Sequence, residues 1–235
     1  MAMQSDSGYV ITPPERASLP VEGESGRFPV RRIYCVGRNY AAHAREMGHD
    51  PDREPPFFFM KPADSIVPSG STVPYPPLTQ DLQYEIELVA AIGKAGADIP
   101  ASEALEHVYG YCVGIDMTRR DLQGEAKKLG RPWDWGKGFD NSAPMGAIRT
   151  VADIGHPSEG RIWLAVNGEV KQDGNLNELI WPMPEIIAFA SRSMRLEPGD
   201  LIMTGTPAGV GPVVAGQTIT GGVDGVGEIK LTYEL

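Results

Sequence analysis

Short apolar runs separated by glycine, proline and polar turns predict most of the strands of this chain. The run at residues 84–92 alternates and is rich in strand formers, so it predicts a strand on which Glu85 and Glu87 share a face. A second run, residues 108–116, ends at Asp116. Further strands are predicted at residues 33–37, 57–60, 201–203 and 227–234, and a hairpin at residues 161–172 around Asn167-Gly168.

Four segments carry features typical of helices, either capping residues at their ends or an apolar stripe along one face. Asn39 is a good N-cap and Gly48 a good residue just past the C-terminus of a short helix. Thr118 is expected to cap another helix, which ends near Gly130. The predicted helices cover residues 39–48, 102–107, 118–129 and 183–194. Because short strands dominate and helices are few, the sequence predicts an α+β fold that is mainly β, with a curled, mainly antiparallel sheet.

Length and composition predict one main domain. The chain has 235 residues, enough to bury a substantial core. Its 28 glycines and 21 prolines, about a fifth of the chain against roughly 12% in average usage, are typical of short strands and many turns. Prolines within residues 13–29 predict an irregular surface arm, with the core starting after it. The expected organisation is an arm at residues 1–30 and a main domain at residues 31–235.

Charge and cysteine content exclude several partners and compartments. The net charge of −10 would repel nucleic acid and anionic membrane surfaces, so neither is an expected partner. A small anionic substrate would need a local cluster of cations. Cys35 and Cys112 lie in apolar runs and are expected to be buried reduced thiols. Without a signal peptide pattern or a long apolar span, the sequence predicts a cytoplasmic protein.

Three acidic residues predict a metal site. Two like charges on one face of a half-buried strand are costly, so Glu85 and Glu87 call for a cation between them, and Asp116 ends the next run. Oxygen-only donors suit Mg²⁺ or Mn²⁺ and not zinc, which recruits His or Cys. The alternative is that the two glutamates lie on the solvated face of an edge strand. Val89 and Ala91 make that face mainly apolar and favour the metal site.

A histidine–glutamate pair is a candidate general base. His43 and Glu46 are three residues apart in a predicted helix, so they share a face and can touch. Glu46 could accept from one ring nitrogen and leave the other free to take a proton, a role worth about 10²–10⁴ in rate. The alternative is an ordinary pair on the helix surface.

Lys137 and the loop at residues 204–211 are candidates for binding anions. Lys137 stands between glycines and beside two tryptophans, which indicates a partly desolvated cation able to stabilise an oxyanion. The alternative is a lysine that reaches solvent over an aromatic surface. The loop lacks the Gly-Lys-Ser/Thr ending of a phosphate-binding loop, but its backbone N–H groups and the Thr206 hydroxyl could hold a carboxylate.

Five separated motifs together resemble the fumarylacetoacetate hydrolase family over about residues 31–235. They are Gly-Arg-Asn-Tyr-Ala-Ala-His at 37–43, Glu-Ile-Glu at 85–87, Asp116 followed by 118–123, Lys137, and Thr-Gly-Thr-Pro-Ala-Gly-Val-Gly at 204–211. Residues 9–21, 132–139 and 161–174 narrow the resemblance to members that cleave fumarylpyruvate, the end of the gentisate branch of aromatic degradation. The family fold is a mixed β-sandwich roll, usually dimeric, so the resemblance implies a homodimer.

The resemblance also implies a role for individual residues. The metal ligands would be Glu85, Glu87 and Asp116. The catalytic pair would be His43 with Glu46, with Lys137 the active-site lysine and Gln123 a substrate contact. Positions near the substrate's anionic groups match Arg38, Lys61, Arg120 and Thr206. Val36 stands near the point where larger eukaryotic members carry a fourth acidic ligand, so water would complete the metal shell.

The implied reaction is cleavage of a C–C bond of a 1,3-diketo acid by water, giving fumarate and pyruvate. A 2-oxo acid can chelate one Mg²⁺ or Mn²⁺ ion through its carboxylate and keto oxygens. His43 would then activate a water, and Lys137 with Gln123 would stabilise the oxyanion.

Two other classes stay open at this point. The same site permits decarboxylation of oxaloacetate, or isomerisation and decarboxylation of a diacid, both of which occur within the family. A metal or dicarboxylate binder without catalysis would keep the carboxylates and need no base. His43 and Lys137 argue against such a binder.

Overall fold

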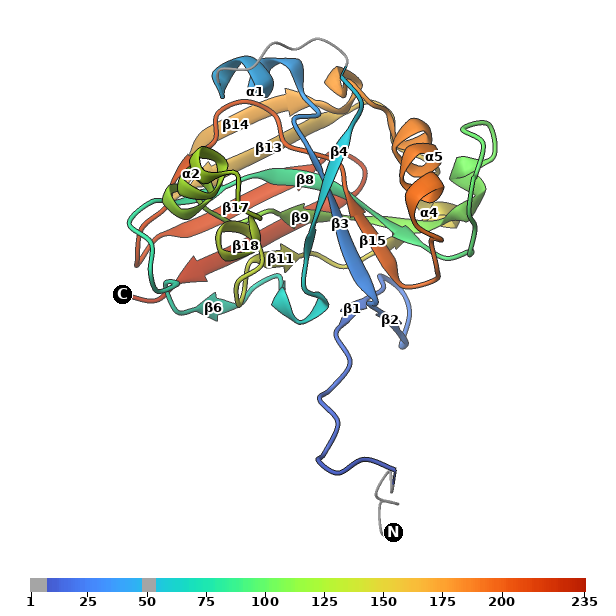
Figure 1. Ribbon diagram of the computed structural model, residues 1–235, viewed down its shortest axis with the longest axis horizontal. Coiled ribbons are helices and arrows are strands. Elements are labelled where there is room, and N and C mark those ends of the chain that lie inside the picture. Colours follow the sequence, from blue (N-terminus) through green and yellow to red (C-terminus); the bar gives the residue numbers. More distant parts are fainter. Residues whose placement is uncertain (1–7, 48–53) are drawn as a thin grey trace.

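The computed structural model describes residues 8–47 and 54–235, and most of the regular structure in them is β-sheet (Figure 1). The largest sheet has the strand order β4-β3-β15-β8-β9-β11-β5, with β12 paired to β9. Its strands are β3 (Arg32–Gly37), β4 (Phe57–Lys61), β5 (Ile66–Pro68), β8 (Ile86–Ile92), β9 (Val108–Ile115), β11 (Ala143–Met145), β12 (Arg149–Thr150) and β15 (Asp200–Met203). A second sheet has the order β14-β13-β17-β18-β6. Its strands are β6 (Thr72–Val73), β13 (Arg161–Val166), β14 (Glu169–Asn175), β17 (Thr218–Val223) and β18 (Gly227–Tyr233).

Two small sheets and a few short helices complete the fold. The small sheets are β10-β7-β16 and β1-β2, with β1 (Ser18–Pro20), β2 (Arg27–Pro29), β7 (Leu82–Tyr84), β10 (Thr118–Arg119) and β16 (Gly211–Pro212). The α-helices are α1 (Ala41–Glu46), α2 (Arg120–Leu129), α3 (Asp134–Lys137), α4 (Val151–Ile154) and α5 (Met183–Ser193). The described residues also form the 3₁₀ turns η1 (Ala63–Ser65), η2 (Ala104–His107) and η3 (Leu176–Glu178). None of the helices in the described residues is long and apolar enough to cross a membrane.

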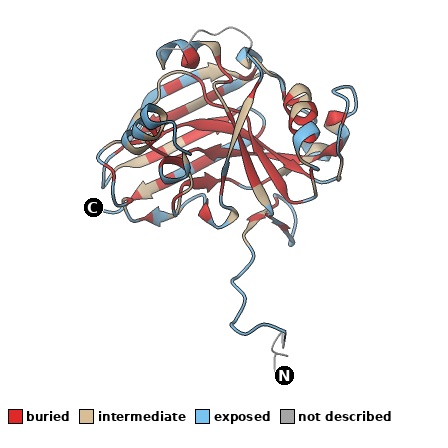
Figure 2. Ribbon diagram, in the orientation of Figure 1, coloured by how far each residue is buried: buried red, intermediate tan, exposed pale blue. Residues whose placement is uncertain are grey.

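The main hydrophobic core lies between the two larger sheets. Ile86, Leu88 and Val113 from β8 and β9 belong to the same buried cluster as Leu164 and Leu231 from β13 and β18. Figure 2 shows the buried residues following these strands through the middle of the molecule. Most neighbouring strands pair antiparallel, while β11–β5, β15–β3 and β18–β6 pair in parallel. The prediction of a mainly β, α+β sandwich with a curled sheet is confirmed.

A second core covers the other face of the largest sheet and corrects the sequence analysis. Leu19 of β1 and Phe28 of β2 face each other in the pairing and are buried with Val89 and the two thiols, Cys35 and Cys112. The prediction of an irregular arm, with the core starting after it, is therefore wrong for residues 18–29. Two three-residue strands are too short for the periodicity of the sequence to show them.

The strand predicted at residues 84–92 is interrupted at Glu85. Up to Tyr84 the chain belongs to β7 and pairs with β10 and β16, and from Ile86 it belongs to β8 and pairs with β9 and β15. Every residue of β8 is buried. Glu85 therefore lies where the chain passes from one sheet to another.

Asn39 does not cap α1. Tyr40 is the N-cap residue and gives no side-chain hydrogen bond. The Asn39 amide instead donates to the carbonyls of Trp181 and Thr204 at 2.9 and 2.8 Å and accepts the Trp181 N–H at 2.7 Å. Asn39 thus fixes the start of the loop that follows β15. Gly48, predicted to end α1, lies outside the described residues.

The remaining helix and turn predictions are mostly confirmed. Thr118 belongs to β10 and α2 begins at Arg120, so the predicted cap is wrong, but Gly130 ends α2 in the left-handed conformation. Of the helix predicted at residues 102–107, only Ala104–His107 is helical, as the 3₁₀ turn η2, whereas α5 matches its prediction. Asn167 and Gly168 both have positive φ, as the predicted tight hairpin requires.

Candidate active site

The three predicted metal ligands converge where β7, β8 and β9 meet. Glu87 lies in β8 and Asp116 directly follows β9, and the Asp116 N–H donates to the Glu85 carbonyl at 2.8 Å. One carboxylate oxygen of each residue lies within 4.8 Å of the other two. Glu85, Glu87 and Asp116 are 6%, 2% and 0% exposed. The alternative of glutamates on a solvated edge strand is therefore wrong.

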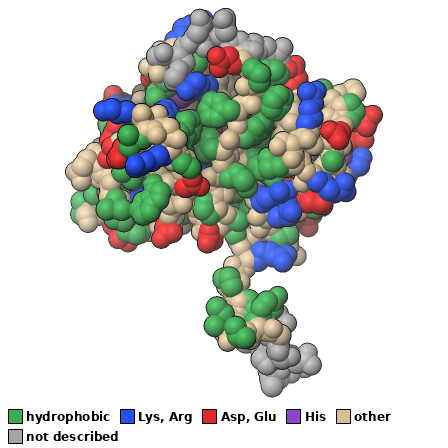
Figure 3. Space-filling view, in the orientation of Figure 1, with side chains coloured by type: hydrophobic (Ala, Val, Ile, Leu, Met, Phe, Trp, Pro, Cys, Tyr) green, Lys and Arg blue, Asp and Glu red, His purple; other side chains and the backbone are tan. Residues whose placement is uncertain are grey.

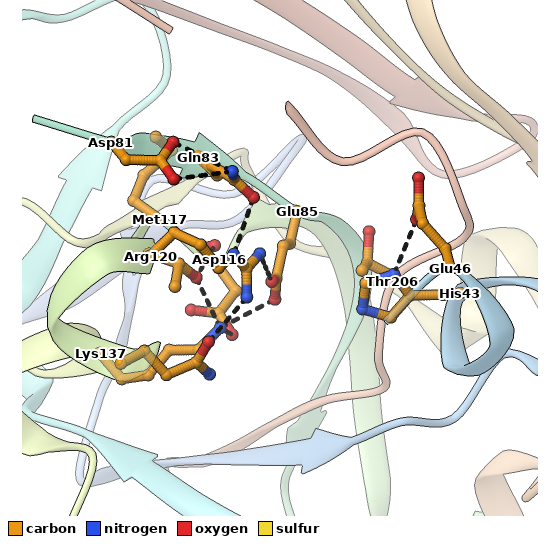
Figure 4. Close-up of polar contacts among 12 residues, drawn as sticks. His43, Glu46, Asp81, Gln83, Glu85, Asp116, Met117, Arg120, Lys137 and Thr206 are labelled. Carbon is orange, nitrogen blue, oxygen red and sulfur yellow. Dashed lines mark hydrogen bonds and ion pairs between the residues drawn. The ribbon is translucent and has the colours of Figure 1, made fainter. Parts of the chain in front are cut away.

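Lys137 of α3 places its ammonium group between the carboxylates of Glu85 and Asp116 (Figure 4). Its Nζ donates to Glu85 Oε2 at 2.8 Å, Asp116 Oδ2 at 2.7 Å and Thr118 Oγ1 at 2.6 Å. Burial would raise the pKa of Glu85, but the charges of Lys137 and Arg120 outweigh it and hold that pKa well below its usual range. Lys137 is 2% exposed, so the alternative of a lysine that reaches solvent is wrong.

Glu87 remains without a salt bridge among the residues that the structure describes. Its Oε2 accepts the Gly205 N–H at 2.7 Å. Burial, and then the negative charges of Asp116 and Glu85, raise its pKa well above the usual range. A divalent cation held by all three carboxylates would relieve this repulsion, and oxygen-only donors suit Mg²⁺ or Mn²⁺. Glu85, Glu87 and Asp116, called the trio below, therefore fit a divalent metal.

Lys61 lies behind the trio and does not line the cavity described below. Its Nζ is 2.8 Å from Asp116 Oδ1 and donates to the carbonyls of Met117 and Lys137 at 3.0 and 2.5 Å. The residue is 1% exposed. Lys61 thus fixes Asp116 and the α3 turn from the rear, and the structure does not bring it together with the predicted substrate contacts.

Arg120 connects the trio to two glutamines. Its guanidinium forms an ion pair with Glu85 and donates to Gln123 Oε1 at 2.8 Å and to Gln83 Oε1 at 2.7 Å. The Gln83 amide in turn donates to the Asp81 carboxylate at 3.0 and 3.2 Å. Gln123 is 3% exposed. These contacts fix the orientation of Gln123, and they commit Arg120 to Glu85.

His43 and Glu46 lie on the other side of Glu85 from Lys137 (Figure 4). His43 Nδ1 is 3.2 Å from Glu46 Oε2, and the Gly209 N–H donates to both oxygens of Glu46 at 3.1 and 3.3 Å. Gly209 has φ +93°, and an added Cβ would lie 2.1 Å from the Lys171 carbonyl oxygen, so only glycine fits there. His43 is 7% exposed, which rules out the alternative of an ordinary surface pair.

Gln172 is a buried residue of the site that sequence reasoning missed. Its Nε2 donates to Thr206 Oγ1 and to the Pro207 carbonyl, both at 2.8 Å, and its Oε1 accepts the Ile86 N–H at 3.0 Å. Gln172 is 0% exposed. It therefore joins the loop after β15 to the start of β8, the strand that carries Glu87. A polar residue in a predicted hairpin strand gives no indication of this role, because such residues usually face solvent.

Most of the predicted site residues line one narrow cavity. They are Arg38, His43, Glu85, Glu87, Asp116, Arg120, Gln123, Lys137 and Thr206. Glu46 lies behind His43 and Lys61 behind Asp116. The walls also contain residues that the sequence did not single out, among them Phe57, Phe59, Lys127 and Trp133. The cavity thus combines a site for a divalent cation, a histidine held by a carboxylate and several cations, as needed to bind an anion and move a proton beside it.

Comparison with known proteins assigns the family. The model for "Fumarylacetoacetate (FAA) hydrolase C-terminal" matches residues 32–233. The chain belongs to the fumarylacetoacetate hydrolase family. A fumarylpyruvate hydrolase from a Ralstonia species is 48% identical over 188 residues, covering 79% of this chain and 97% of the relative. The mitochondrial oxaloacetate tautomerase FAHD1 of Arabidopsis thaliana is 42% identical over 203 residues, covering 86% of this chain and 91% of the relative.

A solved structure of the family resembles this chain over nearly its whole length. The fumarylpyruvate hydrolase from Pseudomonas aeruginosa, solved in complex with Mn²⁺ and pyruvate, is 53% identical with a TM-score of 0.94. The match covers 97% of this chain and 99% of that chain. The predicted family and fold are therefore confirmed, and the chain is an enzyme of this family.

Proposed function

We propose that this enzyme hydrolyses a C–C bond of a 1,3-diketo acid in a metal-dependent reaction, with fumarylpyruvate as substrate and fumarate and pyruvate as products. The observation that carries the proposal is the pairing of the buried trio with a separately anchored base: His43, held by Glu46, lines the same cavity as Glu85, Glu87 and Asp116. The fumarylpyruvate hydrolases among the relatives support the choice of substrate.

The cofactor in this proposal is Mg²⁺ or Mn²⁺, held by Glu85, Glu87 and Asp116. When bound, the cation would polarise the keto oxygen of the substrate and fix the orientation of its 2-oxo acid end. The Mn²⁺ in the Pseudomonas aeruginosa relative supports a divalent ion of this kind. Titrating metal-free enzyme with Mg²⁺ and with Mn²⁺ under one set of conditions, and measuring the activity that each restores, shows which ion is the better cofactor.

His43 is the base that activates water. Its Nδ1 faces Glu46, which leaves Nε2 to take a proton from a water. The water oxygen bonds to the carbonyl carbon on the acyl side. The C–C bond between this carbon and the methylene of the pyruvate half then breaks. Its electron pair stays with the methylene of the pyruvate half, which gains a proton to become a methyl group. The other half leaves as the carboxylate of fumarate.

Lys137 and Gln123 are proposed to stabilise the oxyanion that forms during this attack. All three protons of the Lys137 ammonium are donated to Glu85, Asp116 and Thr118. Lys137 would therefore contact the oxyanion by exchanging one of these partners for it. The Gln123 oxygen accepts from Arg120, which orients its amide N–H₂ group as a donor in the cavity wall.

Oxaloacetate tautomerase activity is the second candidate, because several relatives carry that name, including the mouse protein at 44% identity. Tautomerisation moves a proton between carbon and oxygen and needs no attacking water. Decarboxylation of oxaloacetate, and isomerisation of a diacid, are the further alternatives at the same site.

A comparison of substrates tests the proposal. The Mn²⁺-loaded enzyme is assayed for kcat/KM on fumarylpyruvate, on acetylpyruvate and on oxaloacetate, with products identified by NMR. The proposal expects fastest turnover of fumarylpyruvate. Faster conversion of enol to keto oxaloacetate would favour the tautomerase, and carbon dioxide release the decarboxylase.

Three further expectations come from the sequence and extend the proposal. They are a place at the end of gentisate degradation, a homodimer and a cytoplasmic location. Light scattering coupled to size-exclusion chromatography tests the homodimer: a monomer mass near 25.4 kDa would contradict it.

A further inference from the structure

Two cations of the cavity wall lie outside the carboxylate cluster. Arg38 is held over the ring of Phe57, with Cζ 5.4 Å from its centroid, and Lys127 over the ring of Trp133, with Nζ 5.0 Å from its centroid. The two rings pack edge to face, with centroids 5.5 Å apart and planes at 90°. All four residues line the same cavity. One aromatic pair thus holds two positive charges on the wall of the site.

Neither cation has an acidic partner in the part of the chain that the structure describes. Arg120, Lys61 and Lys137 each pair with Glu85 or Asp116. By contrast, within residues 8–47 and 54–235 neither Arg38 nor Lys127 has a hydrogen bond or an ion pair. In a chain of net charge −10, two unpaired cations in one cavity indicate a place for a negatively charged ligand.

The charges around Lys127 agree with this interpretation. The groups that act on it are Arg120, Arg38 and Lys137, which are positive, and Glu85. Burial, followed by Arg120 and Arg38, lowers the pKa of Lys127 to about 8. A bound carboxylate would relieve the repulsion between these cations. Figure 3 shows basic side chains over α2, the helix that carries Lys127, next to acidic ones of the same region.

We propose that Arg38 and Lys127, held on the Phe57–Trp133 pair, form the subsite for the carboxylate on the acyl side of the substrate, and that Lys127 is the residue that selects a diacid. This inference rests on the proposed function and specifies which acyl group the site takes. Lys61 and Arg120, the other candidate cations from sequence, are already paired with Asp116 and Glu85. Among the residues that the structure describes, Lys127 has no such partner, and it lines the cavity.

The test compares two neighbouring lysines of α2. Lys127→Met removes the charge in the cavity wall, and Lys128→Met removes an exposed charge that does not line it. In the Mn²⁺-loaded enzyme, Lys127→Met should lower kcat/KM for fumarylpyruvate by about 10- to 100-fold, mainly through KM, because a charge-assisted contact is lost. For acetylpyruvate, which lacks the second carboxylate, kcat/KM should change less than about threefold. Lys128→Met should match the wild type. Lys127→Arg keeps the charge and should retain most of the wild-type kcat/KM for fumarylpyruvate.

A binding measurement tests the subsite without turnover. Fumarate binding to the Mn²⁺-loaded enzyme is measured by calorimetry between pH 7 and pH 9.5. Lys127 loses its proton as the pH rises through about 8, so wild-type affinity should fall above that pH. In Lys127→Arg the affinity should persist to higher pH, because arginine stays charged.

The outcomes separate the subsite from the proposed function. Equal losses for both acylpyruvates in Lys127→Met, or no loss for fumarylpyruvate, would overturn the subsite, as would a fumarate affinity that does not depend on Lys127. If the wild type cleaves neither acylpyruvate but binds fumarate through Lys127, the proposed function falls and the subsite stands.

Discussion

Replacement of Gln172 by leucine should destabilise the protein and disturb the site together. Leucine is close to glutamine in volume, so the change removes hydrogen bonds without opening a large cavity. The Gln172 amide makes three contacts, to the Thr206 hydroxyl, the Pro207 carbonyl and the Ile86 N–H, and the residue is 0% exposed. All three partners lose their hydrogen bond at once.

The expected magnitude follows from the partners left behind. A buried polar group without a partner costs about 1–3 kcal/mol. The Ile86 N–H and the Pro207 carbonyl cannot turn to other partners without moving the backbone, while the Thr206 hydroxyl can rotate. We therefore expect a loss of about 2–5 kcal/mol in the free energy of unfolding. For a chain of this size that corresponds to a fall in Tm of about 5–15 °C.

Urea unfolding and calorimetry on the metal-free protein measure this loss, with kcat/KM of the loaded enzyme as a second readout. Gln217→Leu is the matched control, because Gln217 accepts one exposed hydrogen bond from the Val214 N–H and should cost less than about 1 kcal/mol. In Gln172→Leu, kcat/KM should also fall, since Thr206 lines the cavity. An unfolding free energy within about 0.5 kcal/mol of the wild type would refute the reasoning.

Three further predictions concern the base, the loop and the metal. His43→Ala should lower kcat by about 10² or more and leave Mn²⁺ affinity nearly unchanged; unchanged hydrolysis would place the base elsewhere. Gly209→Ala should lower kcat through Glu46, because its Cβ would lie 2.1 Å from the Lys171 carbonyl oxygen, and wild-type kinetics would contradict this contact. Saturating Mn²⁺ should raise Tm, since a ligand at about 100 times its Kd stabilises by about 2.7 kcal/mol. Glu87→Gln should abolish that rise, and an equal rise in this variant would exclude Glu87 as a ligand.

Local patterns predicted that Glu85 and Glu87 share a face and that His43 and Glu46 can touch. His43 and Glu46 are three residues apart in one helix, so that pair follows from helix geometry. Glu85 and Glu87 are two residues apart in an alternating run, which predicted a shared face, although the chain changes sheet at Glu85. The prediction that Asp116 joins the two glutamates as a metal ligand came from the order of the motifs that resemble the family. The curled, mainly β fold followed from many short strands with few helices.

Contacts between distant segments could not be predicted in this way. Gln172 reaches Ile86 and Thr206, far from it along the chain, and its polarity alone indicates a solvent-facing position. Lys127 follows the pattern of an exposed helix residue, and only the packing of α2 against Trp133 places it in the cavity. The change of sheet at Glu85 is likewise set by which strands pair, and not by the local sequence.

The stoichiometry of products from fumarylpyruvate, with and without metal, tests the central claim most directly. The Mn²⁺-loaded wild type should release fumarate and pyruvate in equal amounts, and chelator-treated enzyme should release neither until Mn²⁺ or Mg²⁺ is restored. A loaded enzyme that leaves fumarylpyruvate intact, or cleavage that continues at full rate in metal-free enzyme, would contradict the account.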